Sequence, residues 1–69
     1  MLDDKTKELI AIGASVACNC QTCVLFHTSK SRELNIDPEL IEQAAEVGKM
    51  VRKGAAGQMD KLLSGCSKE

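Results

Sequence analysis

An apolar run near the start of the chain, residues 9–18, constrains the fold more than any other feature. Only Gly13 and Ser15 interrupt its apolar character. As a helix the run is apolar on all sides, and such a helix has to be buried on most of them. A chain of 69 residues is too short to surround it, because a domain of this size buries only about 60% of its unfolded surface. We therefore expect neighbouring copies of the chain to complete the core of a homo-oligomer.

Capping signals indicate where the helices begin. Asp3 or Asp4 offers a carboxylate to the free amides of an opening turn. A second helix is predicted over residues 20–34. Asp37 then stands directly before Pro38, and a proline is well suited to the first helical position because its missing N–H has no partner there in any case. The sequence thus predicts a third helix that begins at this proline.

The chain reads as helix throughout, because no segment alternates apolar and polar residues over a strand's length. The third helix carries small and apolar residues at spacings of three and four, which form one stripe: Leu40, Ile41, Ala44, Ala45, Gly48 and Val51. Arg52 and Lys53 complement the dipole at its end, Gly54 is predicted to terminate it, and residues 59–63 are predicted to form a short last helix. The sequence predicts an all-α protomer of three to four helices, in a single domain over residues 1–69.

Charge and composition exclude several classes of protein. The chain has nine Lys and Arg against ten Asp and Glu, and Phe26 is its only aromatic residue. A nucleic-acid-binding protein normally has a basic excess and stacking aromatics, so we expect no nucleic-acid partner. The apolar run is about half the length that spans a bilayer. Acidic residues precede it, unlike the basic start of a signal peptide, so we expect a cytoplasmic protein without membrane contact.

Cysteine is unusually frequent, and three of the four cysteines are clustered: Cys18, Cys20, Cys23 and Cys66. Without a secretion signal, such cysteines indicate metal binding or thiol redox chemistry in preference to structural disulfides. The cluster within residues 18–23 is typical of a site. Cys66 lies in a polar Ser-Gly-Cys-Ser tail and is predicted to be an exposed thiol outside that site.

The spacing within the cluster favours redox chemistry. On a helix, Cys20, Cys23 and His27 share one face. Neighbours at this spacing are about 5–6 Å apart, a distance that a disulfide accepts, so Cys20 and Cys23 can cycle between dithiol and disulfide. An imidazole one turn beyond Cys23 can take a thiol proton and raise the fraction of reactive thiolate.

Two alternatives use the same residues. Cys18, Cys20, Cys23 and His27 supply four nitrogen or sulfur ligands, the number that tetrahedral zinc requires. This predicts a zinc or iron–sulfur module without turnover. Four ligands within one helical segment have poor tetrahedral geometry, and Cys18 faces away from the others unless the helix begins after it. A redox sensor that forms the disulfide without turnover is the second alternative.

The pattern extends to a glutamate. Glu8, followed twelve positions later by Cys20-x-x-Cys23-x-x-x-His27, resembles the active-site pattern of the alkylhydroperoxidase D-like branch of the carboxymuconolactone decarboxylase family. Residues 7–13 and 46–55 resemble the first and third core helices of that family. The true lactone decarboxylases of the family lack this cysteine pair, so the resemblance implies redox activity and not decarboxylation.

The resemblance implies an alkylhydroperoxidase D-like fold, assembled into trimers or hexamers, and a peroxiredoxin-like enzyme that requires no bound cofactor. Cys23 would attack the peroxide, Cys20 would resolve the product to a disulfide, and His27 and Glu8 would form the proton relay. The substrate would be a hydroperoxide or a disulfide, and an external dithiol donor would regenerate the enzyme.

Two positions qualify this expectation. Thr22 stands between the cysteines, where well-studied members of the branch carry a second histidine. In one straight helix Glu8 would lie about 120° around the axis from Cys20. The relay therefore requires a break in the helix, at Asn19 or near Gly13.

Overall fold

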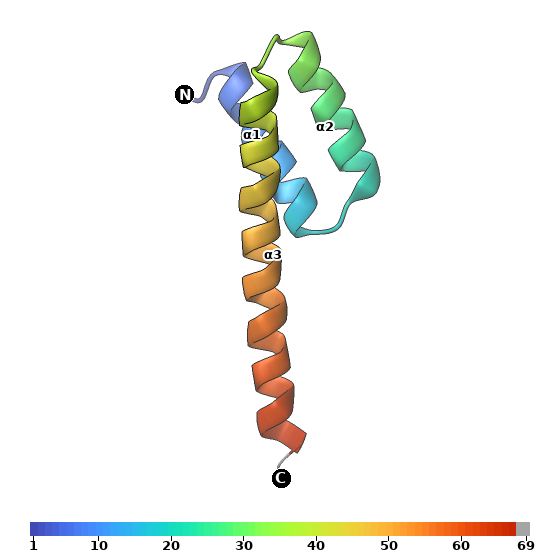
Figure 1. The fold of residues 1–69 in the computed structure, drawn as a ribbon, viewed down its shortest axis with the longest axis vertical. Helices are drawn as coiled ribbons and strands as arrows, with labels where there is room; N and C mark the ends of the chain where they lie inside the picture. Colours follow the sequence, from blue (N-terminus) through green and yellow to red (C-terminus); the bar gives the residue numbers. More distant parts are fainter. Residues whose placement is uncertain (68–69) are drawn as a thin grey trace.

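The computed structural model describes residues 1–67, with side chains described as far as residue 65. In this part of the chain there are three helices and no strand: α1 (Asp4–Ala17), α2 (Gln21–Glu33) and α3 (Pro38–Ser67). α1 packs against both α2 and α3, and the second half of α3 extends beyond the other two helices (Figure 1). The predicted all-α fold is confirmed. No helix in the described part has the length and hydropathy to span a membrane.

The predicted caps are present at two helix starts. Asp3 precedes α1, and its carboxylate accepts the Thr6 backbone N–H at 2.7 Å. Hydrogen bonds from Thr6 hold the pKa of the Asp3 carboxyl below 3.8. Asp37 precedes α3, and its carboxylate accepts the Glu39 backbone N–H at 2.9 Å. Pro38 is the first residue of α3, as predicted.

A sharp turn separates α1 from α2. Asn19 has a left-handed backbone, with φ of 58°, a conformation that asparagine tolerates better than most residues. The Cys20 backbone N–H then donates to the Ser15 carbonyl at 2.9 Å, which satisfies one of the free carbonyls at the end of α1. The helix therefore breaks at Asn19, one of the two positions expected from the sequence, and α2 runs back along α1 (Figure 1).

Glycines allow α1 and α3 to approach closely. Gly48 is buried, and a Cβ at this position would lie 2.7 Å from the Cβ of Val16. A Cβ on Gly13 would lie 3.3 Å from the carbonyl oxygen of Ala44. A side chain at Gly48 would clash with α1, and one at Gly13 would be tight, so both glycines allow the close approach of the two helices.

The protomer buries little apolar surface on its own. Only Ile12 and Ile36 are buried hydrophobic residues in the described part of the chain. Ile10, within the apolar run, is 55% exposed, and Leu40 and Val51 of the predicted stripe are 45% and 52% exposed. One protomer therefore leaves apolar surface exposed on both the apolar run and the stripe of α3, as the all-round apolar character of the run predicts.

The predicted end of the third helix is wrong. α3 continues through Gly54 and includes residues 59–63, so there is no separate last helix. A glycine ends a helix by adopting a positive φ, and no described glycine does so. Most of the residues after Gly54 are good helix formers, and their propensity outweighs the cost of about 1 kcal/mol for each of Gly54 and Gly57. The side chain of Cys66, predicted to be an exposed thiol, lies outside the described side chains.

Candidate redox site

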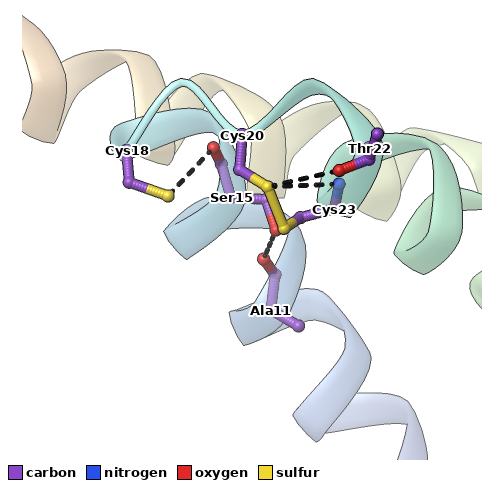
Figure 2. Close-up of a disulfide and its surroundings, with 6 residues drawn as sticks. All are labelled: Ala11, Ser15, Cys18, Cys20, Thr22 and Cys23. Atoms are coloured by element: carbon purple, nitrogen blue, oxygen red, sulfur yellow. Dashed lines mark hydrogen bonds between the residues drawn. A yellow bond between two sulfur atoms is a disulfide. The ribbon is translucent and has the colours of Figure 1, made fainter.

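The site centres on a disulfide between Cys20 and Cys23 at the start of α2, the pairing that the spacing predicts. Their Cα atoms are 5.2 Å apart. Cys20 is the N-cap of α2, and its Sγ accepts the Cys23 backbone N–H at 3.3 Å. The Thr22 hydroxyl lies 3.8 Å from the same sulfur, a contact drawn as a dashed line in Figure 2.

The position of Cys20 has a chemical consequence for the reduced protein. The first amides of a helix have no partner within the helix, and the dipole places partial positive charge there. A thiolate at this end is stabilised by both effects. Both Cys20 and Cys23 lie at the start of α2, where a negatively charged thiolate is favoured. The thiolate is the reactive form of cysteine in thiol–disulfide exchange.

Glu8 and His27 meet across two helices. Nδ1 of His27, on α2, lies 2.8 Å from Oε1 of Glu8, on α1. The side chains are 27% and 18% exposed, so the pair is partly shielded from water. The turn at Asn19 makes this contact possible, because it folds α2 back alongside α1.

The contact with Glu8 orients the His27 ring. A carboxylate next to Nδ1 favours the neutral tautomer with its hydrogen on that nitrogen, which leaves the lone pair on Nε2. Cys23 lies one turn before His27 on α2, a spacing that puts the Cβ atoms about 5–6 Å apart. The ring of Phe26 meets the imidazole edge-on, with centroids 5.1 Å apart.

Cys18 takes no part in the disulfide between Cys20 and Cys23. It caps the C-terminus of α1, is exposed, and its Sγ donates to the Ser15 carbonyl at 3.5 Å. Among the described residues, no group of three or more His, Cys, Asp or Glu side chains is arranged to hold a metal ion. The predicted alternative of a metal bound by Cys18, Cys20, Cys23 and His27 thus has no support from the geometry.

Arg52 has a role that the sequence interpretation missed. Its Nη1 donates to Asn19 Oδ1 at 2.9 Å and to the Val16 carbonyl at 3.4 Å. The sequence suggested that this arginine complements the end of its own helix, but α3 continues to Ser67. Arg52 instead complements the C-terminus of α1 and fixes the turn that precedes Cys20. An asparagine just after a helix is a recognisable capping signal, but its arginine partner is not visible in the sequence.

The sequence model of the carboxymuconolactone decarboxylase family matches residues 1–58. The match includes α1, α2 and α3 as far as residue 58, and with them the disulfide and the Glu8–His27 pair. The chain therefore belongs to the carboxymuconolactone decarboxylase family. No curated protein and no solved structure matches the chain significantly.

Proposed function

We propose that this protein is a thiol-dependent peroxidase of the alkylhydroperoxidase D-like branch of its family. The observation that carries the proposal is the Glu8–His27 pair at 2.8 Å, one helical turn from the Cys20–Cys23 disulfide. A structural disulfide needs no such neighbour. A thiol that attacks peroxide needs a group that takes its proton and a group that protonates the leaving oxygen.

The oxidative half of the cycle uses Cys23 as the nucleophile. His27 takes the thiol proton at Nε2, and the Cys23 thiolate attacks one oxygen of the hydroperoxide. The O–O bond breaks, Cys23 becomes a sulfenic acid, and the imidazolium returns its proton to the departing alkoxide, which leaves as the alcohol. Glu8 stabilises the imidazolium between these steps. The Cys20 thiol then attacks the sulfenic sulfur, so that the disulfide forms and water leaves.

The reductive half restores the two thiols. An external dithiol is oxidised to its own disulfide while Cys20 and Cys23 gain two electrons and two protons. In the reverse direction, the reduced Cys20 and Cys23 would reduce a substrate disulfide and become oxidised themselves. The protein would then act as a thiol–disulfide oxidoreductase. Peroxide turnover with a dithiol donor distinguishes the peroxidase from a redox sensor, which forms the disulfide without turning over.

Serine variants test the two cysteine roles. We expect Cys23→Ser to lose peroxide consumption, because the nucleophile is gone. Cys20→Ser should consume one equivalent and stop at a sulfenic acid that dimedone traps. Cys18→Ser is the matched control, a nearby cysteine outside the pair, and should keep full turnover with a dithiol. Sulfenic acid trapped on Cys20 in the Cys23→Ser variant would contradict the assignment.

We also propose that the protein works as a homo-oligomer. An apolar groove of about 410 Å³ lies between α1 and α3, lined by Leu9, Ile10, Gly13, Ala14, Ala17, Ala44, Val47 and Val51. No polar side chain is among its lining residues. Together with the small core of one protomer, this surface supports packing of a second copy against α1 and α3.

A further inference from the structure

A second groove lies next to the disulfide. It is open, has a volume of about 450 Å³, and is lined by residues from all three helices and the turn at Asn19. Its lining includes Val16, Asn19, Cys20, Val24, Leu25 and Arg52. Cys20 is the only one of the two bonded cysteines that lines it. The groove therefore has Cys20, apolar side chains and the guanidinium group of Arg52 in its lining.

Arg52 has capacity left for a ligand. Both of its hydrogen bonds use Nη1, with Asn19 and Val16 as acceptors. Among the described residues, no carboxylate lies within ion-pair distance of its guanidinium, and no acidic side chain lines the groove. An arginine has five N–H donors and binds carboxylates through two of them in parallel. A partly buried guanidinium held in place by Asn19 is therefore ready to bind an anion without further ordering.

We propose that this groove receives the thiol that reduces the Cys20–Cys23 disulfide, and that this thiol carries a carboxylate bound by Arg52. The inference rests on the proposed function, because it requires that the disulfide be reduced in each cycle. The apolar walls suit a short aliphatic chain between the thiol and the carboxylate. The carboxylate end of the ligand would face α3, where Arg52 lies, and the thiol end would face Cys20.

The reaction in the groove is a two-step exchange. The incoming thiolate attacks Sγ of Cys20, the Cys20–Cys23 bond breaks, and Cys23 leaves with the electron pair as a thiolate. A second thiol then attacks the donor's sulfur in the mixed disulfide, and Cys20 leaves as a thiolate. The two donor thiols become a disulfide, the protein gains two electrons, and both cysteines are protonated. Attack at Cys20 leaves Cys23 free for the next peroxide.

The test compares two thiols of equal length that differ only in charge. Mercaptopropionate and mercaptopropionamide are mixed with the oxidised protein, and the rate of disulfide loss is expressed per thiolate. We expect the carboxylate to react about three- to tenfold faster, the range for a charge-assisted hydrogen bond at a partly exposed site. Arg52→Gln should abolish this preference, so that the carboxylate and the amide react at similar rates per thiolate, whatever the loss of the Asn19 contact does to both rates. Arg52→Lys, which keeps the charge but not the paired donors, should retain part of it.

Lys53→Gln is the matched control, because it removes the same charge from the neighbouring exposed position outside the groove lining. Its preference should equal that of the unmodified protein. Equal rates for the two thiols in the unmodified protein would overturn the inference. So would an Arg52→Gln variant that slows both thiols equally, or a Lys53→Gln variant that also loses the preference. The assay starts from oxidised protein and uses no peroxide, so failure of the peroxidase proposal remains separately visible.

Discussion

Replacing Glu8 by glutamine removes a charge from the proposed relay while keeping nearly the same shape. The amide oxygen of glutamine can still accept the hydrogen on Nδ1 of His27, so the neutral imidazole keeps its orientation. It cannot stabilise the imidazolium that forms when His27 takes the thiol proton. The variant therefore isolates the electrostatic contribution of Glu8 from its positioning contribution.

The size of the effect follows from the contact. Nδ1 and Oε1 are 2.8 Å apart, and the two side chains are 27% and 18% exposed, so the bond is well formed and partly shielded. A hydrogen bond to a charged group contributes about 1.5–3 kcal/mol, and a neutral one about 0.5–1.5 kcal/mol. The difference, about 1–1.5 kcal/mol, corresponds to a loss of about five- to thirteenfold in the rate of peroxide reduction.

Stopped-flow measurement of disulfide formation in the reduced protein after peroxide addition gives this rate directly. Glu46→Gln is the matched control, because Glu46 forms an exposed pair with Lys49 on α3, at 3.1 Å, with side chains 62% and 56% exposed. Such surface pairs contribute little, so its rate should stay within about twofold of the unmodified protein. A Glu8→Gln rate equal to that of the control would refute the relay.

Three further predictions concern the fold and its assembly. Gly48→Ala should destabilise the protein by about 1–3 kcal/mol in thermal unfolding, because the new Cβ would meet Val16; Gly57→Ala, on α3 with no atom within 4 Å of its Cβ position, should instead stabilise it by about 0.5–1 kcal/mol. Asp3 has a lowered pKa in the folded chain, so its stabilising effect is full above 3.8 and is lost as the pH falls through the lowered value; Asp3→Ala should therefore show a flatter acid side in its Tm–pH curve. Val47→Glu places a charge in the apolar groove between α1 and α3 and should reduce the mass measured by light scattering to that of a smaller species; an unchanged mass would argue against packing at this surface.

Local signals were sufficient to predict most of the fold. Asp3 and Asp37 cap helices because a short carboxylate reaches the amides two or three residues ahead, a contact that lies within the sequence window itself. The end of α3 could not be predicted in the same way. Gly54 is compatible with both a helix interior and a helix end, and the choice depends on the summed propensity of the residues that follow.

The site was predictable along one helix but not across helices. The spacing of Cys20 and Cys23 is a local property, and the disulfide confirms it. The contact between Glu8 and His27 depends on the turn at Asn19, whose left-handed backbone no periodicity reveals. From the sequence, a helix break that brings Glu8 to the site could lie at Asn19 or near Gly13, and helical periodicity does not choose between these positions. The role of Arg52 is not visible in the sequence, because its two acceptors lie on α1, at Val16, and in the turn that follows, at Asn19.

Mapping of the disulfide after one equivalent of peroxide tests the central claim most directly. The fully reduced protein is treated with hydroperoxide, its free thiols are alkylated, and the peptides are analysed by mass spectrometry. The account predicts the loss of two protons, localised to a Cys20–Cys23 bridge, with Cys18 alkylated. Free or overoxidised Cys20 and Cys23 without a bridge would contradict it.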